Sequence, residues 1–344
     1  MKNLKKYSLL LALIALVACS NKDWEYDDYD YTSCYFPYQT PVRTLLLGKY
    51  DQGFNDNDNN HTFQIGATMA GVYTNDEERT VYYQVDPSLL NGVANVAALP
   101  SHYYEILDPS PVKINVGSTK AIINVKLTDA FFTDSLSFNT NANEVSYVIP
   151  LKLTEVDGLD SILSGVAADN VLTPRLYYAD DWATQPKDYC LFGIKYINKY
   201  HGYYLQRGVD VATSDTEVIE SVYHAEFVEQ DEVTRVVTAG YNKVLVTNRI
   251  RRGTAKSPGD VVLLLTFDDN NNCSVESAQG DAYNVTGSGR MLENGDTWGG
   301  KEQDVIYLDY TYDDVVNSES HSVKDTLVIR DRDVKFEAFE VLLK

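Results

Sequence analysis

The stretch Arg-Thr-Val-Tyr-Tyr-Gln-Val-Asp at residues 79–86 shows the pattern that decides the fold of this chain. Val81, Tyr83 and Val85 alternate with more polar neighbours, which places the two sets of side chains on opposite faces of an extended strand. The same two-residue period recurs along most of the sequence, whereas helical periodicity is scarce. The sequence therefore predicts an all-β protein.

Longer strands follow in the second half, separated by turn clusters such as Asp-Asp-Asn-Asn-Asn at residues 268–272. Regularly spaced strands with tight turns are typical of β-sandwiches and β-barrels. We expect a sandwich over residues 34–198 and a barrel-like domain over residues 199–344. The strands expected from residue 189 onward are 189–197, 202–206, 217–229, 233–239, 243–249, 260–267, 273–277, 304–312, 323–329 and 334–342.

Two features of the first half carry more specific expectations. The strand-like stretches 112–116 and 121–127 are joined by Gly117-Ser118, which predicts a hairpin. Pro150 lies within the strand expected at residues 146–153. Because proline has no amide hydrogen to donate, we expect this strand at a sheet edge or with a bulge.

The N-terminal sequence is typical of a targeting segment. Three lysines precede an apolar run at residues 9–17, which is too short to span a bilayer. The run ends in Leu-Val-Ala-Cys at residues 16–19, the pattern of a bacterial lipobox. We expect residues 1–18 to be a lipoprotein signal peptide and Cys19 to be lipidated, which would anchor the protein firmly. An ordinary secretory signal that contains a cysteine is the alternative.

The following segment, residues 19–33, is rich in acidic residues. Its early run Lys22-Asp23-Trp24-Glu25 resembles the surface-export signal of Bacteroidota lipoproteins. That resemblance implies a protein held on the outer face of the outer membrane, in contact with the membrane through its lipid alone. A solvated acidic tether that spaces the fold from the bilayer is a compatible interpretation.

Length and charge limit the function. The chain has 344 residues, which suggests about two domains. Its 50 acidic residues outnumber 29 basic ones, and a net charge of −21 repels nucleic acids and disfavours strongly anionic polysaccharides. The 26 tyrosines suit half-buried sheets and wet binding surfaces. Cys34, Cys190 and Cys273 fit no metal or redox motif, so we interpret them as core residues, with one disulfide as the alternative.

Several segments resemble a two-domain family of Bacteroidota surface lipoproteins of unknown function that is linked to polysaccharide-utilisation loci. The segments are YFPYQTPVRTL at 35–45, LTDAFF at 127–132, YVIPL at 147–151, GIKYINKYHG at 193–202 and TWGG at 297–300. The resemblance implies an immunoglobulin-like sandwich, as found ahead of endo-β-N-acetylglucosaminidase-type enzymes, followed by a lipocalin-like (calycin-like) barrel. It also implies surface glycan binding, or a scaffold role beside an outer-membrane glycan importer.

Three aromatic residues are candidates for carbohydrate binding. Trp298 stands between small residues in Thr-Trp-Gly-Gly, where glycine lets a ligand approach closely. Trp182, in Asp-Asp-Trp-Ala, is a second candidate, and Tyr283 is a third. An exposed aromatic face can stack on a sugar ring. The alternative for each tryptophan is a structural role as a plug. In this interpretation Trp298 packs over the barrel mouth.

No catalytic, cofactor or metal motif is present. The five histidines show no paired ligand spacing. We interpret His201 as structural, because its segment, Tyr200-His201-Gly202-Tyr203-Tyr204, resembles the first strand of lipocalin-like folds. In those folds an aromatic residue of this strand closes the barrel floor. Residues 268–272 lack the glycine and glutamate of a calcium loop, which favours a polar hairpin turn. With 50 carboxylates, accidental acid pairs are common and no glycosidase dyad can be chosen.

We therefore expect a non-catalytic surface lipoprotein that binds a neutral polysaccharide or oligosaccharide and works with a glycan importer. The alternative function is a structural or protein-interaction subunit of an outer-membrane assembly. A hydrolase is the least favoured hypothesis.

Overall fold

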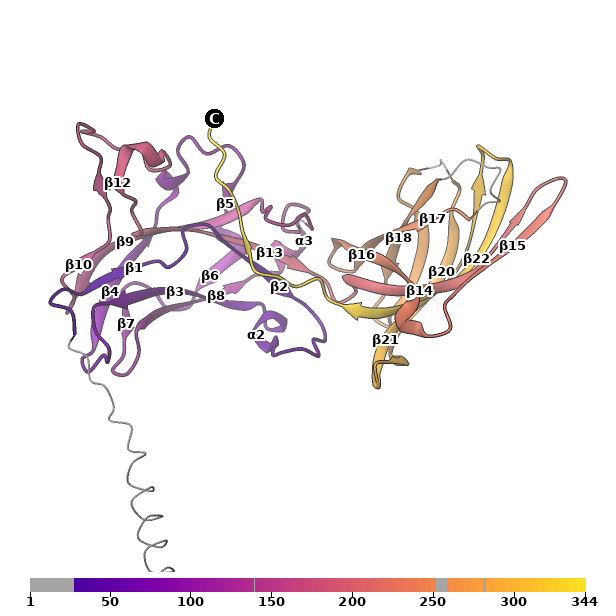
Figure 1. Ribbon diagram of the computed structural model, residues 1–344, viewed down its shortest axis with the longest axis horizontal. Helices are drawn as coiled ribbons and strands as arrows, with labels where there is room; N and C mark the ends of the chain where they lie inside the picture. The colour runs from indigo at the N-terminus through magenta and orange to yellow at the C-terminus, as the bar shows by residue number, and fades with distance from the viewer. Residues whose placement is uncertain (1–27, 139, 252–258, 281–282) are drawn as a thin grey trace, which may run out of the picture.

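The computed structural model describes residues 28–138, 140–251, 259–280 and 283–344. It confirms the predicted all-β fold, with a sandwich and a closed barrel that lie end to end (Figure 1). The signal peptide and Cys19 lie outside the described residues. Within the described part of the chain, no helix is long and apolar enough to cross a membrane.

The sandwich is built from two sheets that enclose one apolar core. That core includes Cys34, Phe36, Ile123, Ile149 and Tyr196, all nearly inaccessible to solvent. The first sheet has the order β10 (Ser161–Ile162), β1 (Ser33–Tyr35), β3 (Thr62–Ala70), β8 (Lys120–Leu127) and β6 (Tyr104–Ile106). The second has the order β23 (Glu337–Ala338), β2 (Pro41–Leu46), β13 (Tyr189–Ile197), β9 (Tyr147–Asp157), β4 (Arg79–Val85) and β7 (Val112–Ile114), with β5 (Ala97–Ala98) also paired to β9.

Short elements connect these strands. A two-stranded sheet joins β11 (Val166–Ala167) to β12 (Trp182–Thr184). The helical turns are α2 (Asp56–Asn59), α3 (Asp129–Thr133), η1 (Pro87–Leu90), η2 (Ser101–Tyr103), η3 (Ala179–Asp181) and η4 (Val228–Gln230).

The barrel is a meander of eight strands closed by pairing between its first and last members. Along the wall they are β14 (Gly202–Thr213), β16 (Glu232–Gly240), β17 (Lys243–Arg249), β18 (Asp260–Phe267), β19 (Asn272–Ser277), β20 (Thr286–Trp298), β21 (Lys301–Asp314) and β22 (Glu319–Asp331). A ninth strand, β15 (Val218–Tyr223), pairs with the far half of β14. Closure runs from Tyr203↔Asp331 to Thr213↔Ser320.

The barrel has two ends. The sandwich end carries the starts of β14 and β21, and the outer end carries the β21–β22 hairpin (Figure 1). At the sandwich end, the Tyr200 ring stacks on Phe267 at 3.7 Å and the Tyr204 hydroxyl donates to the Tyr200 carbonyl. Both tyrosines are buried, which confirms the predicted aromatic floor.

The structure corrects two local predictions. Stretches 112–116 and 121–127 do not form a hairpin, because β7 pairs with β4 in one sheet and β8 pairs with β3 in the other. Gly117, at φ +78°, lies in the corner between the two sheets. Pro150 lies in β9, a central strand, where the neighbour changes from β5 to β4. Its carbonyl still accepts the Asp86 amide, so the sheet tolerates the missing donor at that change of neighbour.

The C-terminal residues also differ from the expected division, which assigned residues 199–344 to the barrel. After β22 the chain returns to the sandwich, where β23 pairs with β2 and Phe339 packs against Val42 and Leu191 (Figure 1). Buried Lys195 reaches Glu337 at 2.8 Å and fixes this return. The apolar residues of the tail are therefore buried on the sandwich, where the sequence had placed a barrel strand.

One arginine joins the two modules. Arg332 donates to the carbonyls of Leu47 and Lys49 in the sandwich and to those of Asn198 and His201 in the connection, at 2.7–2.9 Å. Burial lowers the pKa of its guanidinium below the ordinary value. Because these hydrogen bonds converge on backbone atoms from both modules, they hold the sandwich and the barrel in one relative orientation.

The remaining cysteines agree with the favoured interpretation. Cys34, Cys190 and Cys273 are all buried, and none forms a disulfide within the described residues. Burial raises the pKa of the Cys34 thiol to about 12, which keeps it protonated and unreactive at neutral pH.

Candidate functional site

Trp298 is presented by a tight hairpin at the sandwich end of the barrel. It pairs with Lys301 across a two-residue turn in which Gly299 and Gly300 have φ values of +59° and +74°. Two successive positive φ values are typical of the hairpin turns that match the twist of the strands. The indole is half-buried, and its Nε1–H donates to the Ile329 carbonyl at 2.8 Å. Its position is therefore fixed by the fold.

The Trp298 side chain lines a cleft of about 310 Å³ between the two modules. The barrel supplies the β20–β21 hairpin and the end of β22. The sandwich supplies the loop 49–52, Lys-Tyr-Asp-Gln. Phe54, two residues beyond this loop, has a fully exposed ring. A volume of this size lies at the lower end of the range for small-molecule sites.

Several polar groups in the cleft are available to a ligand. The side chains of Gln52, Lys301 and Gln303 line it and make no hydrogen bond to another described residue. Lys49 is held in place, since its Nζ donates to Asn294 Oδ1 at 3.0 Å and lies 3.4 Å from Asp51. The cleft thus combines an indole with amides, cations and carboxylates.

The charge of the cleft differs from that of the whole chain. Its cationic lining residues are Lys49, Lys199, Lys301, Arg330 and Arg332, and its acidic ones are Asp51, Asp304 and Asp331. The Arg332 guanidinium is committed to the domain junction. The exposed lysines therefore create a locally basic opening on a protein that is acidic as a whole.

The structure does not bring the three candidate aromatic residues together. Trp182 lies in the sandwich, half-buried, with its Nε1–H donating to the Arg175 carbonyl at 3.0 Å. Tyr283 lies at the outer end of the barrel, where its ring meets Tyr312 edge-on at 6.3 Å. Trp298 lines the cleft between the two modules, which neither Trp182 nor Tyr283 lines, and its proposed sugar-binding role stays a prediction.

His201 has the structural role that the sequence suggested. It is buried at the domain junction, and its Nδ1 accepts the Thr238 amide at 3.0 Å. Burial, with a further contribution from Arg235 and Arg332, lowers the pKa of His201 to about 3. A neutral, buried imidazole cannot serve as a cationic group for a ligand, so the role of His201 is structural.

Residues 268–272 form the predicted hairpin turn. Asp268 Oδ1 accepts the amides of Asn270 and Asn272 at 2.9 and 2.8 Å, and Asn271 has a φ of +63°. Among the described residues, one group of histidine and carboxylate side chains is compact enough to hold a metal ion. This group, Asp314, Glu319 and His321, lies at the outer end of the barrel, away from Trp298.

The sequence interpretation missed the sandwich side of the cleft. Gln52 and Lys49 stand in a polar loop that has no motif of its own. Their approach to Trp298 depends on Arg332, which binds the Lys49 carbonyl from the barrel side. The one available signal was Phe54, a large apolar residue within a run of Asn, Asp and Gly, which is unusual for a solvated loop.

Fold and cleft together define a two-module β protein with a site between a sandwich and an eight-stranded barrel. A family model described as a domain of unknown function, DUF5627, matches residues 199–333, and a model of an N-terminal domain matches residues 29–160. No curated protein matches the sequence.

Two solved structures are similar to the chain. A Bacteroides ovatus protein of unknown function is 34% identical with a TM-score of 0.84, and the match covers 92% of this chain and all of that one. This chain belongs to the family of that protein. An auxiliary nutrient binding protein from Bacteroides thetaiotaomicron is 15% identical with a TM-score of 0.37, over 86% of this chain and 95% of the other. That score is too low to indicate a shared fold.

Proposed function

We propose that this protein is a non-catalytic, lipid-anchored surface protein that binds a neutral saccharide in the cleft beside Trp298. The observation that carries the proposal is the position of Trp298. Its indole is fixed by a hydrogen bond to Ile329 and stands in a cleft beside amide and lysine side chains that have no other hydrogen-bond partner among the described residues.

This combination suits a sugar. The apolar face of a sugar ring packs on an indole, while planar amides and ammonium groups satisfy its hydroxyls. The Gly299-Gly300 turn carries no side chain that would block the approach, since nothing lies within 4 Å of a Cβ built at either position. Gln52 and Gln303 would provide paired donor and acceptor contacts. The exposed lysines also leave room for a saccharide that carries an isolated acidic group.

The proposed anchor is Cys19, on the outer face of the outer membrane. The described chain begins at the end of the sandwich that is remote from the barrel (Figure 1). A lipid at Cys19 would therefore make the sandwich a spacer that holds the cleft away from the bilayer. A glycan importer in the same membrane is the proposed recipient of the saccharide.

Affinity electrophoresis in gels that contain neutral polysaccharides tests the site, with a glycan array to define the ligand. Wild-type protein should be retarded, and Trp298→Ala should lose at least about ten-fold in affinity, as expected for loss of a stacking platform. Trp182→Ala is the matched control, because it removes a half-buried indole that also donates to a backbone carbonyl. It should leave the retardation unchanged.

Four results would count against the proposal. Absence of retardation by every glycan tested would remove saccharide binding, and equal loss in both tryptophan variants would remove the cleft as the site. Release of reducing ends from a polysaccharide by the purified wild-type protein would show that it is a hydrolase. Labelling with palmitate that persists in Cys19→Ala would contradict the anchor.

A second candidate function, a protein-interaction subunit, is favoured by the outer end of the barrel. Within the described residues β15 pairs on one side only, with β14, and Val218 and Val222 on it are more than half exposed. Val315 and Val316 at the neighbouring β21–β22 turn are over 70% exposed. An open edge with apolar side chains can add a strand from a partner. Co-purification of one defined partner that is lost in Val315→Ser/Val316→Ser and needs no sugar would support this function.

A further inference from the structure

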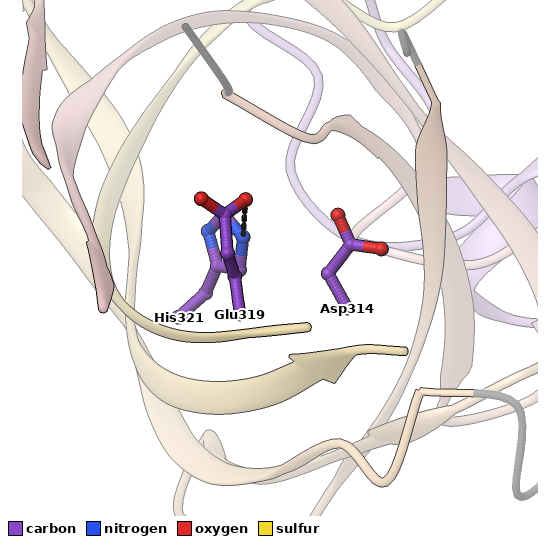
Figure 2. Close-up of side chains that lie close together, drawn as sticks. All are labelled: Asp314, Glu319 and His321. Atoms are coloured by element: carbon purple, nitrogen blue, oxygen red, sulfur yellow. Dashed lines mark ion pairs between the residues drawn. The ribbon is translucent and has the colours of Figure 1, made fainter. Parts of the chain in front are cut away.

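The β21–β22 hairpin places one histidine and two carboxylates inside the outer end of the barrel. Asp314 is the last residue of β21, Glu319 is the first of β22, and His321 follows two residues later on the same face. All three are buried, and one potential ligand atom from each lies within 4.8 Å of the other two. Figure 2 shows the Asp314 carboxylate facing Glu319 and His321 across the barrel interior.

His321 is held by a carboxylate on its other nitrogen. Its Nδ1 lies 2.8 Å from Oδ1 of Asp210, a buried residue of the neighbouring strand β14. The Tyr312 ring stacks on the imidazole at 4.4 Å, and its hydroxyl donates to Asp210 Oδ2 at 3.4 Å. These contacts fix the plane of the imidazole and direct Nδ1 at the Asp210 carboxylate, so Nε2 is the ring atom that can bind a metal ion.

The Nε2 atom of His321 points at Glu319 without reaching it. Among the described residues it has no hydrogen-bond partner, although the side chain is almost completely buried. The nearest carboxylate oxygen, Glu319 Oε2, is 3.9 Å away, which is too long for a hydrogen bond. Two atoms bound to the same zinc ion can be up to about 4.1 Å apart, the sum of two metal–ligand bonds. The observed separation is therefore compatible with a shared metal ion.

We propose that this hairpin binds a divalent transition-metal ion, with His321 Nε2 and carboxylate oxygens of Glu319 and Asp314 as ligands. Asp210 is the positioning residue, because a ligating histidine usually donates its other N–H to a carboxylate. One imidazole nitrogen with two carboxylates suits zinc or manganese, whereas calcium takes six to eight oxygens. A doubly charged cation would also balance the two carboxylates inside the barrel.

The site is independent of the proposed saccharide cleft, which lies at the other end of the barrel. Asp314 has a second role, since its Oδ2 accepts the Asn317 side-chain amide at 2.9 Å and shapes the hairpin turn. Tyr283, which the sequence suggested as a sugar platform, packs edge-on against the Tyr312 ring. Tyr312 in turn stacks on the His321 imidazole. The competing arrangement is an imidazole held between Asp210 and Glu319 with no metal.

Zinc titration against a chromophoric chelator tests the proposal on the purified chain, freed of any affinity tag. We expect one tight zinc ion per chain and a rise in melting temperature with zinc that calcium does not produce. His321→Asn and Glu319→Gln should each weaken zinc binding at least about 100-fold, because each removes a ligand atom. Asp210→Asn should weaken it about 10–100-fold at unchanged stoichiometry.

His224→Asn is the matched control, because His224 is exposed and its imidazole lies within hydrogen-bond distance of the neighbouring Ala225 carbonyl. Zinc binding that this variant loses and His321→Asn retains would overturn the site, and so would a wild-type protein that binds no zinc. X-ray absorption at the zinc edge of the wild-type complex covers the case of variants that do not fold. One imidazole with oxygen ligands supports the proposal, and a shell without imidazole overturns it.

Discussion

The two ends of the barrel bury polar groups in opposite ways. At the sandwich end a cation is buried, since Arg332 donates four hydrogen bonds to backbone carbonyls and His201 is neutral beside it. From the middle of the barrel to its outer end, carboxylates are buried and accept hydrogen bonds from side chains. Asp325 accepts from Gln206, Asn248, Tyr223 and Tyr310.

This difference separates two tasks. Backbone carbonyls cannot move without moving the chain segments that carry them, so the guanidinium of Arg332 fixes one module against the other. Side-chain donors can rearrange, so the outer end can adapt its buried carboxylates to a cation. Within the barrel, the buried carboxylates are thus concentrated in the half that lies away from the domain junction.

The largest effect is expected from Asp325→Ala, which tests whether the barrel interior depends on its carboxylate network. Four donors would lose their shared acceptor inside the barrel, where Asp325 is 3% exposed. Unpaired buried polar groups cost about 1–3 kcal/mol each before relaxation, so we expect a loss of about 3–5 kcal/mol in the free energy of unfolding. Urea denaturation measures it.

The control for that variant is Asp309→Ala. Asp309 lies on the outer face of β21, exposed, and its ion pair with Lys324 is also exposed. Such pairs contribute little, so the change should stay within about 0.5 kcal/mol. If Asp325→Ala were as mild as this control, the network would not stabilise the barrel.

The next effect is a pH dependence confined to the sandwich end. Burial, helped by Arg235 and Arg332, lowers the pKa of His201 to about 3 in the folded state, against 6.5 in the unfolded chain. Between these values the unfolded state binds the extra proton, so acidification destabilises the fold. From pH 7 to pH 5 the loss due to His201 should be about 2 kcal/mol.

Comparison with His201→Asn isolates this contribution. The asparagine oxygen can replace Nδ1 as acceptor for the Thr238 amide but does not titrate in this range. The variant should therefore lose about 2 kcal/mol less than wild type on going from pH 7 to pH 5, as measured by urea denaturation at both pH values. Parallel losses in the two proteins would mean that His201 is not held neutral.

Local patterns predicted most barrel strands, although not β20 (Thr286–Trp298), and they did not predict long-range partners. The alternation that marks β14 and β22 also tells which residues point inward, such as Tyr204 and Leu327. Barrel closure, however, joins Tyr203 to Asp331 and has no local signal. The return of Phe339 to the sandwich was missed for the same reason, since an apolar strand pattern does not name the sheet that it joins.

The sites show the same limit. The Gly-Gly turn beside Trp298 was visible in the sequence, but the opposing loop with Gln52 comes from the other module. Glu319 and His321 are two residues apart, and in a strand this spacing puts both on one face. This spacing alone does not predict a metal site, because the common sequence motifs pair histidines or place the ligands on a helix. Asp210, more than 100 residues earlier, is placed beside His321 only by barrel closure.

The smallest predicted effect tests whether backbone geometry alone shapes the sandwich end. Gly299→Ala adds a Cβ with no atom within 4 Å, so any cost comes from its φ of +59°. We expect a loss of about 1 kcal/mol in the free energy of unfolding. Gly66→Ala is the control, because Gly66 has no positive φ and its added Cβ would meet Ile122 at an ordinary 3.6 Å. That variant should be neutral or slightly stabilised, since alanine restricts the unfolded chain.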